Sequence, residues 1–196
     1  MSDVEHLKSL FEFHPDFPQK GVNFCDILPV LRDPIAFESL ITHMLHHIFS
    51  VTLPKLRAAA KTDEERKRVK IDAVVGLDAR GFLFGPQLAQ RLGAAFLPVR
   101  KRGKLPGENV QAEYVKEYGK DIFEMPSRTI ESSHGGPANI IVVDDLIATG
   151  GSAGAAGELV KKVGGKTVEY IFVVAIPFLK GEEKLDAPSY HLVEVD

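Results

Sequence analysis

Apolar runs rich in β-branched residues alternate with segments of helical periodicity along most of this chain. These mostly apolar runs predict strands at residues 71–77, 94–99, 140–143 and 167–175. Apolar positions that recur at helical spacing predict helices over residues 81–92 and 152–163. This alternation is typical of a mostly parallel, twisted sheet flanked by helices, so the sequence predicts the α/β class.

The N-terminal third of the chain has a less regular pattern. Apolar residues at helical spacing predict a short amphipathic helix over residues 4–11. Residues 14–34 are rich in proline and predict a structured loop without regular secondary structure. Asp33 and Pro34 then predict the N-cap and first turn of a second helix. The charged run at residues 61–70 predicts a solvated approach to the first strand of the sheet.

The strand at residues 140–143 is predicted to end abruptly in Asp144 and Asp145, and a glycine-rich segment at 148–152 follows. Adjacent carboxylates repel each other unless hydroxyls, cations or a metal occupy the site. A helix predicted to begin near Ser152 would direct its unpaired amides and its dipole to the same place. An ordinary turn with solvated aspartates is the plainer alternative, but the complete strand, acid, glycine and helix unit favours a phosphorylated sugar as ligand.

Two common glycine-rich motifs are absent from this segment. It contains no G-x-G-x-x-G dinucleotide fingerprint, and the chain has no G-x-x-x-x-G-K-[ST] triphosphate loop. The sequence therefore favours neither a nicotinamide or flavin dinucleotide nor a nucleoside triphosphate.

The predicted strand at residues 71–77 is followed by Asp78, Ala79 and Arg80, which open a helix. Exposed amides and a guanidinium suit a pyrophosphate. A helix capped by Asp78 with a surface arginine would give the same pattern, so this motif alone leaves both interpretations open.

The predicted strand at residues 94–99 is followed by four cations and a long segment, residues 100–119, rich in Lys, Gly and Pro. This composition predicts a mobile functional loop. A solvated patch or a nucleic-acid contact is the alternative for the cations. Next to a site for an anionic ligand, phosphate binding is the better interpretation.

Bulk properties narrow the class of protein further. The formal net charge of -3 gives no electrostatic footprint for nucleic acid. Cys25 is the only cysteine, so no intrachain disulfide can form and a cytoplasmic location is expected. We find neither a signal peptide nor an apolar stretch long enough for a membrane helix. His43 and His47 have metal-ligand spacing, but a partly exposed helix face is the favoured interpretation.

Residues 142–152, Val-Val-Asp-Asp-Leu-Ile-Ala-Thr-Gly-Gly-Ser, are similar to the ribose 5-phosphate signature of the type I phosphoribosyltransferases. Further stretches resemble the branch of that family that acts on adenine, at residues 15–22, 76–86, 100–107, 117–119 and 178–181. The resemblance covers nearly the whole chain. It implies the type I phosphoribosyltransferase fold in a single domain over residues 1–196, with a small hood contributed mainly by about residues 1–33.

The resemblance also implies a role for each matching position. The phosphate of the sugar is expected to bind to Ala148, Thr149, Gly150, Gly151 and Ser152. Pyrophosphate is expected at Ala79, Arg80, Arg100, Lys101 and Lys104. The hood over adenine is expected to include Val22, Asn23, Phe24 and Cys25. The implied catalytic residues are Glu117, Tyr118, Asp144 and Asp145.

The implied reaction joins adenine to 5-phosphoribosyl-1-pyrophosphate (PRPP) and releases AMP and pyrophosphate, a pentosyl transfer of purine salvage. The implied cofactor is Mg²⁺, bound through PRPP with no direct protein ligand, and the implied assembly is a homodimer. Some family members have Arg where this chain has Cys25, so a side-chain role at that position is in doubt. A transferase for 6-oxopurines, a PRPP-sensing regulator of nucleic-acid binding and a PRPP-binding protein without activity remain as alternatives.

Overall fold

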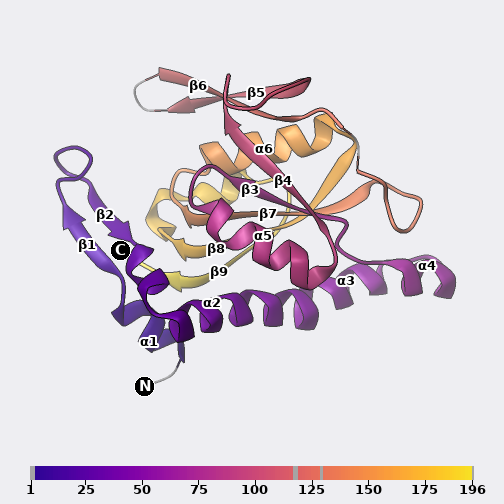
Figure 1. Ribbon diagram of the computed structural model, residues 1–196, viewed down its shortest axis with the longest axis horizontal. Helices are drawn as coiled ribbons and strands as arrows, with labels where there is room; N and C mark the ends of the chain where they lie inside the picture. Colours follow the sequence, from indigo (N-terminus) through magenta and orange to yellow (C-terminus); the bar gives the residue numbers. More distant parts are fainter. Residues whose placement is uncertain (1–2, 117–118, 129, 196) are drawn as a thin grey trace.

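The computed structural model describes residues 3–116, 119–128 and 130–195 of the chain. The strands of its main sheet are β3 (Ala73–Leu77), β4 (Ala95–Lys101), β5 (Asn109–Lys116), β6 (Gly119–Pro126), β7 (Ala138–Ile147), β8 (Gly165–Ala175) and β9 (Ser189–Glu194). Their order across the sheet is β5-β6-β4-β3-β7-β8-β9. Figure 1 shows this sheet at the centre of the molecule with helices on both of its sides.

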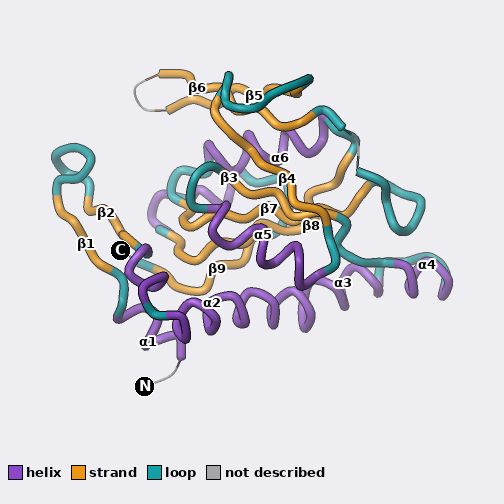
Figure 2. The backbone as a smooth tube through the Cα atoms, in the orientation of Figure 1, coloured by secondary structure: helices purple, strands orange, loops and turns teal. Residues whose placement is uncertain are grey.

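The strands from β4 to β9 in this order are parallel, whereas β5 and β6 form an antiparallel hairpin added beside β4. The predicted parallel sheet is therefore confirmed, although β9 and the hairpin were not predicted. The expectation of a loop over residues 100–119 is wrong for much of its length. Ala112 and Tyr114 are buried whereas Gln111 and Glu113 are exposed, so this part of β5 has the alternating burial of a half-buried strand. Figure 2 shows β5 and β6 as strands beside α6 (Gly151–Lys162).

The helices include the ones expected from periodicity. Besides α6 they are α1 (Asp3–Ser9), α2 (Pro34–His47), α3 (Leu53–Ala58), α4 (Asp63–Arg68) and α5 (Gly81–Leu92). Shorter turns are η1 (Leu28–Arg32), η2 (Ile48–Thr52), η3 (Pro177–Leu179) and η4 (Gly181–Lys184). In the described part of the chain, none of the helices has the length and apolar character that a membrane crossing needs.

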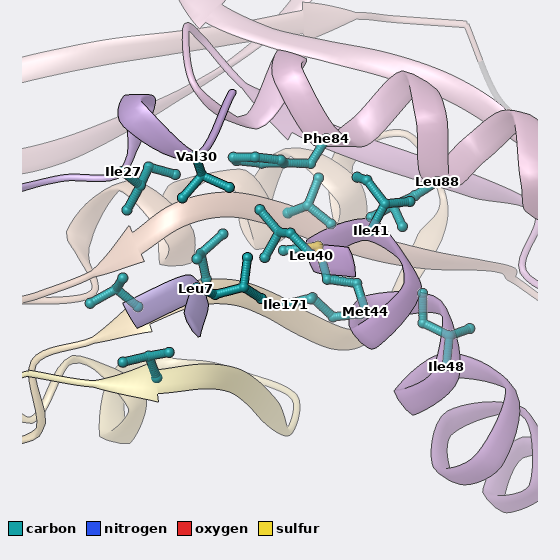
Figure 3. Packing of buried hydrophobic residues seen from close by; sticks show 14 of the residues in the cluster. Leu7, Ile27, Val30, Leu40, Ile41, Met44, Ile48, Phe84, Leu88 and Ile171 are labelled. Atoms are coloured by element: carbon teal, nitrogen blue, oxygen red, sulfur yellow. The ribbon is translucent and has the colours of Figure 1, made fainter. Parts of the chain in front are cut away.

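The two faces of the sheet bury different side chains, because successive residues of a strand point to opposite sides. Val74 of β3 belongs to the cluster that contains α1, α2 and α5, and Val75 belongs to the one beneath α6. Figure 3 shows the first cluster, in which Leu40 of α2, Phe84 of α5 and Ile171 of β8 are buried together. The carboxyl ends of the strands are thus fixed between two packed layers of helices.

The N-terminal segment contains more regular structure than expected. β1 (Glu12–Pro15) pairs with β2 (Asn23–Asp26) in an antiparallel hairpin, and η1 follows it. The prediction of a loop over residues 14–34 is wrong there, because strand pairing satisfies backbone groups despite the prolines. Figure 1 shows this hairpin extending from the body of the molecule.

The side chains of Asp33 and Thr62 cap the N-termini of α2 and α4. The N-cap prediction for Asp33 is confirmed, since its Oδ1 accepts the amides of Ile35 at 2.9 Å and Ala36 at 3.2 Å. The charged run at residues 61–70 is solvated but largely helical, which the sequence interpretation missed. Thr62 caps α4, whose acidic first turn and basic last turn complement the helix dipole.

Candidate active site

Asp144 and Asp145, called the acid pair below, lie on the part of β7 beyond its last pairing with β3. The last register pair between β3 and β7 is Gly76 with Val143, but β7 stays paired with β8 as far as Ile147. The expectation that the strand stops at Val143 is therefore wrong, and Asp144 and Asp145 belong to β7 itself. One edge of β7 is left open beside them, and a ligand can approach both carboxylates there.

A cavity of about 220 Å³ lies at this edge and is lined by Arg80, Asp144, Asp145 and residues 146–153. Asp145 is 5% exposed, and its Oδ2 accepts a hydrogen bond from Nε of Arg80. Burial, together with the nearby charge of Asp145, raises the pKa of Asp144 well above its ordinary value. The site thus holds one carboxylate paired with a guanidinium and another that gains from a cation or hydroxyls.

The segment at residues 148–152, called the phosphate loop below, forms the floor of the same cavity. Gly150 has a φ of 76°, a left-handed conformation in which a side chain is strained. α6 begins at Gly151, one residue before the predicted start. The free amides and the dipole of a helix N-terminus make such a loop suitable for an anion. The predicted acid pair and glycine-rich loop are therefore brought together.

The turn between β3 and α5 connects the cavity with the N-terminal hairpin. Its Asp78–Ala79 peptide bond is cis, and the side chain of Arg80 reaches Asp145. The guanidinium carbon of Arg80 also lies 5.3 Å from the centre of the Phe24 ring. Phe24 packs edge-to-face against Phe17, with ring centres 5.2 Å apart. The hairpin therefore places an aromatic face beside Arg80, whose Nε is bonded to Asp145 of the acid pair.

The other expected hood residues differ in their surroundings. Val22 is half-buried and Asn23 is exposed, whereas Cys25 is 4% exposed. Burial, with smaller effects of Asp145 and Asp26, raises the pKa of Cys25 to about 11. The thiol is therefore neutral at physiological pH and supplies no charge to the site.

Of the cations expected to bind pyrophosphate, only Arg80 lines the cavity. Arg100 is connected with it indirectly, because its Nε donates to Oδ2 of Asp78 at 2.7 Å. Nζ of Lys101 lies 3.4 Å from Oδ2 of Asp121 on β6, and Lys104 is exposed. The structure therefore brings one predicted cation into the cavity and leaves Lys101 and Lys104 outside it.

Glu124 holds the backbone of the basic segment that follows β4, a role that the sequence did not predict. It is 3% exposed, and its Oε1 accepts the amides of Lys104 and Leu105, each at 2.9 Å. Burial opposes ionisation, but these backbone donors lower the pKa of Glu124. Arg100 also holds the Lys104 carbonyl at 3.0 Å. Only the pairing of Glu124 with Arg100 in the sheet reveals this role, since both are ordinary charged residues in sequence.

Three further sets of residues bear on the predictions for catalysis and metal binding. Glu117 and Tyr118 lie outside the described residues. Nε2 of His47 lies 3.0 Å from Oε1 of the buried Glu169, which gives this helix histidine a structural partner. In the described ranges, Glu12, His14 and Asp26 bring possible ligand atoms within 4.8 Å of one another on the β1–β2 hairpin. Exposed acidic groups often gather without a metal, so this cluster supports no assignment.

Comparison with known proteins defines the class to which this fold and site belong. The family described as phosphoribosyl transferase domain matches residues 56–196. Adenine phosphoribosyltransferase of Yarrowia lipolytica is 50% identical over 187 residues, which are 95% of this chain and 93% of that protein. Adenine phosphoribosyltransferase 1 of Saccharomyces cerevisiae is 46% identical over 192 residues, 98% of this chain and 93% of that one.

The fold agrees with the sequence comparison. A crystal structure of the Saccharomyces cerevisiae adenine phosphoribosyltransferase, complexed with adenine and an imino-altritol bisphosphate, superposes with a TM-score of 0.83. Its sequence is 46% identical, and the match covers 97% of this chain and 98% of that one. The chain therefore belongs to the phosphoribosyltransferase family, within its adenine phosphoribosyltransferase branch.

Proposed function

We propose that this protein transfers the phosphoribosyl group of PRPP to adenine, giving AMP and pyrophosphate in purine salvage. The observation that carries the proposal is the single cavity shared by Asp144, Asp145, Arg80 and the phosphate loop. The carboxylates suit the ribose hydroxyls, the guanidinium suits a leaving pyrophosphate, and the amides of the loop suit a sugar phosphate. Relatives of 46–50% identity that are adenine phosphoribosyltransferases support the same activity.

Adenine is proposed to bind under the N-terminal hood, whose residues are about 1–33 of one domain over residues 1–196. The family match begins only at residue 56, so the hood lies outside the part shared with the wider family. Phe24 offers a ring face next to the cavity, and Val22, Asn23 and Cys25 would add contacts through their main chain. The crystal structure of the yeast relative includes adenine, which supports this choice of base.

The proposed chemistry is displacement at the anomeric carbon of the ribose. Positive charge develops on the sugar as its bond to pyrophosphate lengthens, and Asp144 and Asp145 stabilise that charge. Arg80 stabilises the negative charge that grows on the leaving pyrophosphate, together with Ala79 and Arg100 of the adjacent turn and strand. Lys101 and Lys104 would join them only by reorienting toward the cavity.

The site is suited to Mg²⁺ brought in by PRPP rather than held by a protein cage. Asp145 is bonded to Arg80 and Asp78 to Arg100, so both carboxylates are already paired with arginines. Mg²⁺ usually keeps several waters and is bound largely by substrate phosphates, which agrees with an ion that enters with PRPP and has no direct protein ligand. When bound, the ion would supply positive charge that lowers the cost of departure of the leaving pyrophosphate.

A base is also required, since the attacking adenine nitrogen must lose a proton. Glu117 is the proposed base and Tyr118 its companion in closing the site. Closure over the reacting centre would exclude water that could otherwise hydrolyse PRPP. The segment proposed to close, residues 102–118, includes β5 and the turn before it.

A homodimer in the cytoplasm completes the proposal. Large apolar side chains such as Ile35, 82% exposed, and Phe178, 68% exposed, suit an interface between two copies. The single cysteine, Cys25, is a free thiol, which suits a reducing compartment. Sedimentation equilibrium tests the dimer, because a single species of monomer mass at micromolar concentration would contradict it.

Formation of AMP and pyrophosphate from adenine and PRPP tests the activity. We expect both products in equal amounts, and we expect neither once Mg²⁺ is chelated. Binding of PRPP without product would instead indicate an inactive binding protein. A gel-shift assay with and without PRPP, run in parallel, distinguishes the regulator alternative, which requires a PRPP-dependent shift of nucleic acid.

A further inference from the structure

The phosphate loop rests against a second segment that follows β8 and contains Gly181. A Cβ atom added to Gly181 would lie 2.2 Å from the carbonyl oxygen of Ala148, and one added to Gly150 would lie 2.2 Å from the carbonyl oxygen of Gly181. No side chain fits at either position. The two backbones are therefore in direct contact, and the second segment supports the loop from behind.

Lys184 adds a polar contact to this support. Its Nζ donates to the carbonyl oxygen of Thr149 at 2.7 Å. Lys184 is the last residue of η4, and Lys180 precedes η4 with a φ of 53°, a left-handed conformation that turns the chain. Because the C=O and N–H of one trans peptide point in opposite directions, fixing the Thr149 carbonyl also fixes the Gly150 amide.

We infer that Lys184 is a positioning residue for the sugar phosphate, acting through the peptide between Thr149 and Gly150. A carbonyl oxygen turned toward a phosphate would repel it, and the ammonium group holds this carbonyl in another direction. The same ammonium places a positive charge beside the phosphate loop. The inference rests on the proposed function, in which this loop receives the 5-phosphate of PRPP.

The position of Lys184 allows a clean substitution. Its side chain is exposed, so Lys184→Met leaves no buried group unpaired and the fold should persist. Lys184→Arg keeps a donor and the charge. Lys180→Met is the matched control, because Lys180 carries the same charge in the same segment but lies near Glu183, with 3.9 Å between Nζ and Oε1.

Steady-state kinetics and calorimetry on these three variants test the inference. We expect Lys184→Met to raise KM for PRPP and Kd for AMP about tenfold, the loss typical of one charge-assisted hydrogen bond. KM for adenine, Kd for adenosine and the melting temperature should stay near wild-type values. Lys184→Arg should restore most of the affinity, and Lys180→Met should behave as wild type.

Three results would overturn the inference. They are wild-type AMP affinity in Lys184→Met, an equal loss of AMP and adenosine binding, and an equal effect of Lys180→Met. Wild-type protein that forms no AMP from adenine and PRPP would instead contradict the proposed function. Calorimetry of AMP against adenosine still decides the role of Lys184 in that case, because it requires no turnover.

Discussion

Nε of Arg80 donates to Oδ2 of Asp145, which joins the turn after β3 to the acid pair of β7. The same guanidinium lies 5.3 Å from the ring centre of Phe24 in the N-terminal hairpin. One side chain thus contacts the proposed sites of ribose and adenine, and it is the only predicted pyrophosphate cation in the cavity. Arg80 therefore links the proposed sites of adenine, ribose and pyrophosphate.

Arg80→Met should lower kcat/KM for PRPP by about 10²–10³, the loss found when one preorganised donor to a developing charge is removed. Asp145 would also lose its partner, so the effect should fall on both KM and kcat. Initial rates at varied PRPP measure it. Arg91→Met is the control, because Arg91 pairs with Glu38 at the surface, and its rates should match wild type.

Asp144→Asn should make the protein more stable and less active. The raised pKa means that the folded protein binds this proton more tightly than the unfolded chain does. The free energy of unfolding therefore falls as pH rises from the ordinary aspartate value, about 3.9, through the folded value. At neutral pH the asparagine avoids this penalty, so the melting temperature should rise by about 2–4 °C per kcal/mol gained.

Thermal unfolding of the two proteins without ligand, followed from pH 3 to pH 8, checks this expectation. The difference in melting temperature should shrink toward zero below about pH 4, where Asp144 is protonated in both states. An asparagine variant less stable than wild type at neutral pH would show that the carboxylate is stabilising and would contradict the assignment.

Phe24→Leu should raise KM for adenine about tenfold and change KM for PRPP much less, since a stacking face is lost beside an intact acid pair. Phe49→Leu provides the control, because Phe49 is 54% exposed on η2. Equal effects of the Phe24 variant on both Michaelis constants would argue against a hood that recognises the base.

Glu117→Leu should lower kcat by about 10²–10⁴ while PRPP binding changes little, as expected for loss of a general base. Single-turnover rates and PRPP titration separate the two quantities. Glu64→Leu is the control, since Glu64 lies on α4 and pairs with Arg68 at the surface. Turnover near the wild-type value in Glu117→Leu would remove this residue from the mechanism.

The sequence predicted the parallel sheet and the acid pair because both are local patterns. The buried strand segment at residues 140–143 is a continuous apolar run, and Asp144 and Asp145 stand shortly before a glycine-rich helix start. It did not predict β5, because the flanking Lys, Gly and Pro residues are typical of loops. Burial of Ala112 against other elements overrides that local preference.

The support around the site could not be predicted, because it depends on contacts between residues distant in sequence. Glu124 meets the amides of residues 104 and 105 only after β6 pairs with β4. Lys184 reaches Thr149 from a segment 35 residues further along the chain. Neither residue type nor spacing signals these contacts. A single sequence therefore indicates the residues that line the cavity better than the residues that hold them in place.

The most direct test of the central claim compares initial rates with adenine, hypoxanthine, guanine and xanthine at equal concentration, with saturating PRPP and Mg²⁺. The account predicts rapid formation of AMP and a kcat/KM for adenine at least about 10²-fold above that for each oxopurine, as expected where a site lacks partners for the wrong polar groups. Preference for hypoxanthine or guanine, or no nucleotide product with any base, would contradict it.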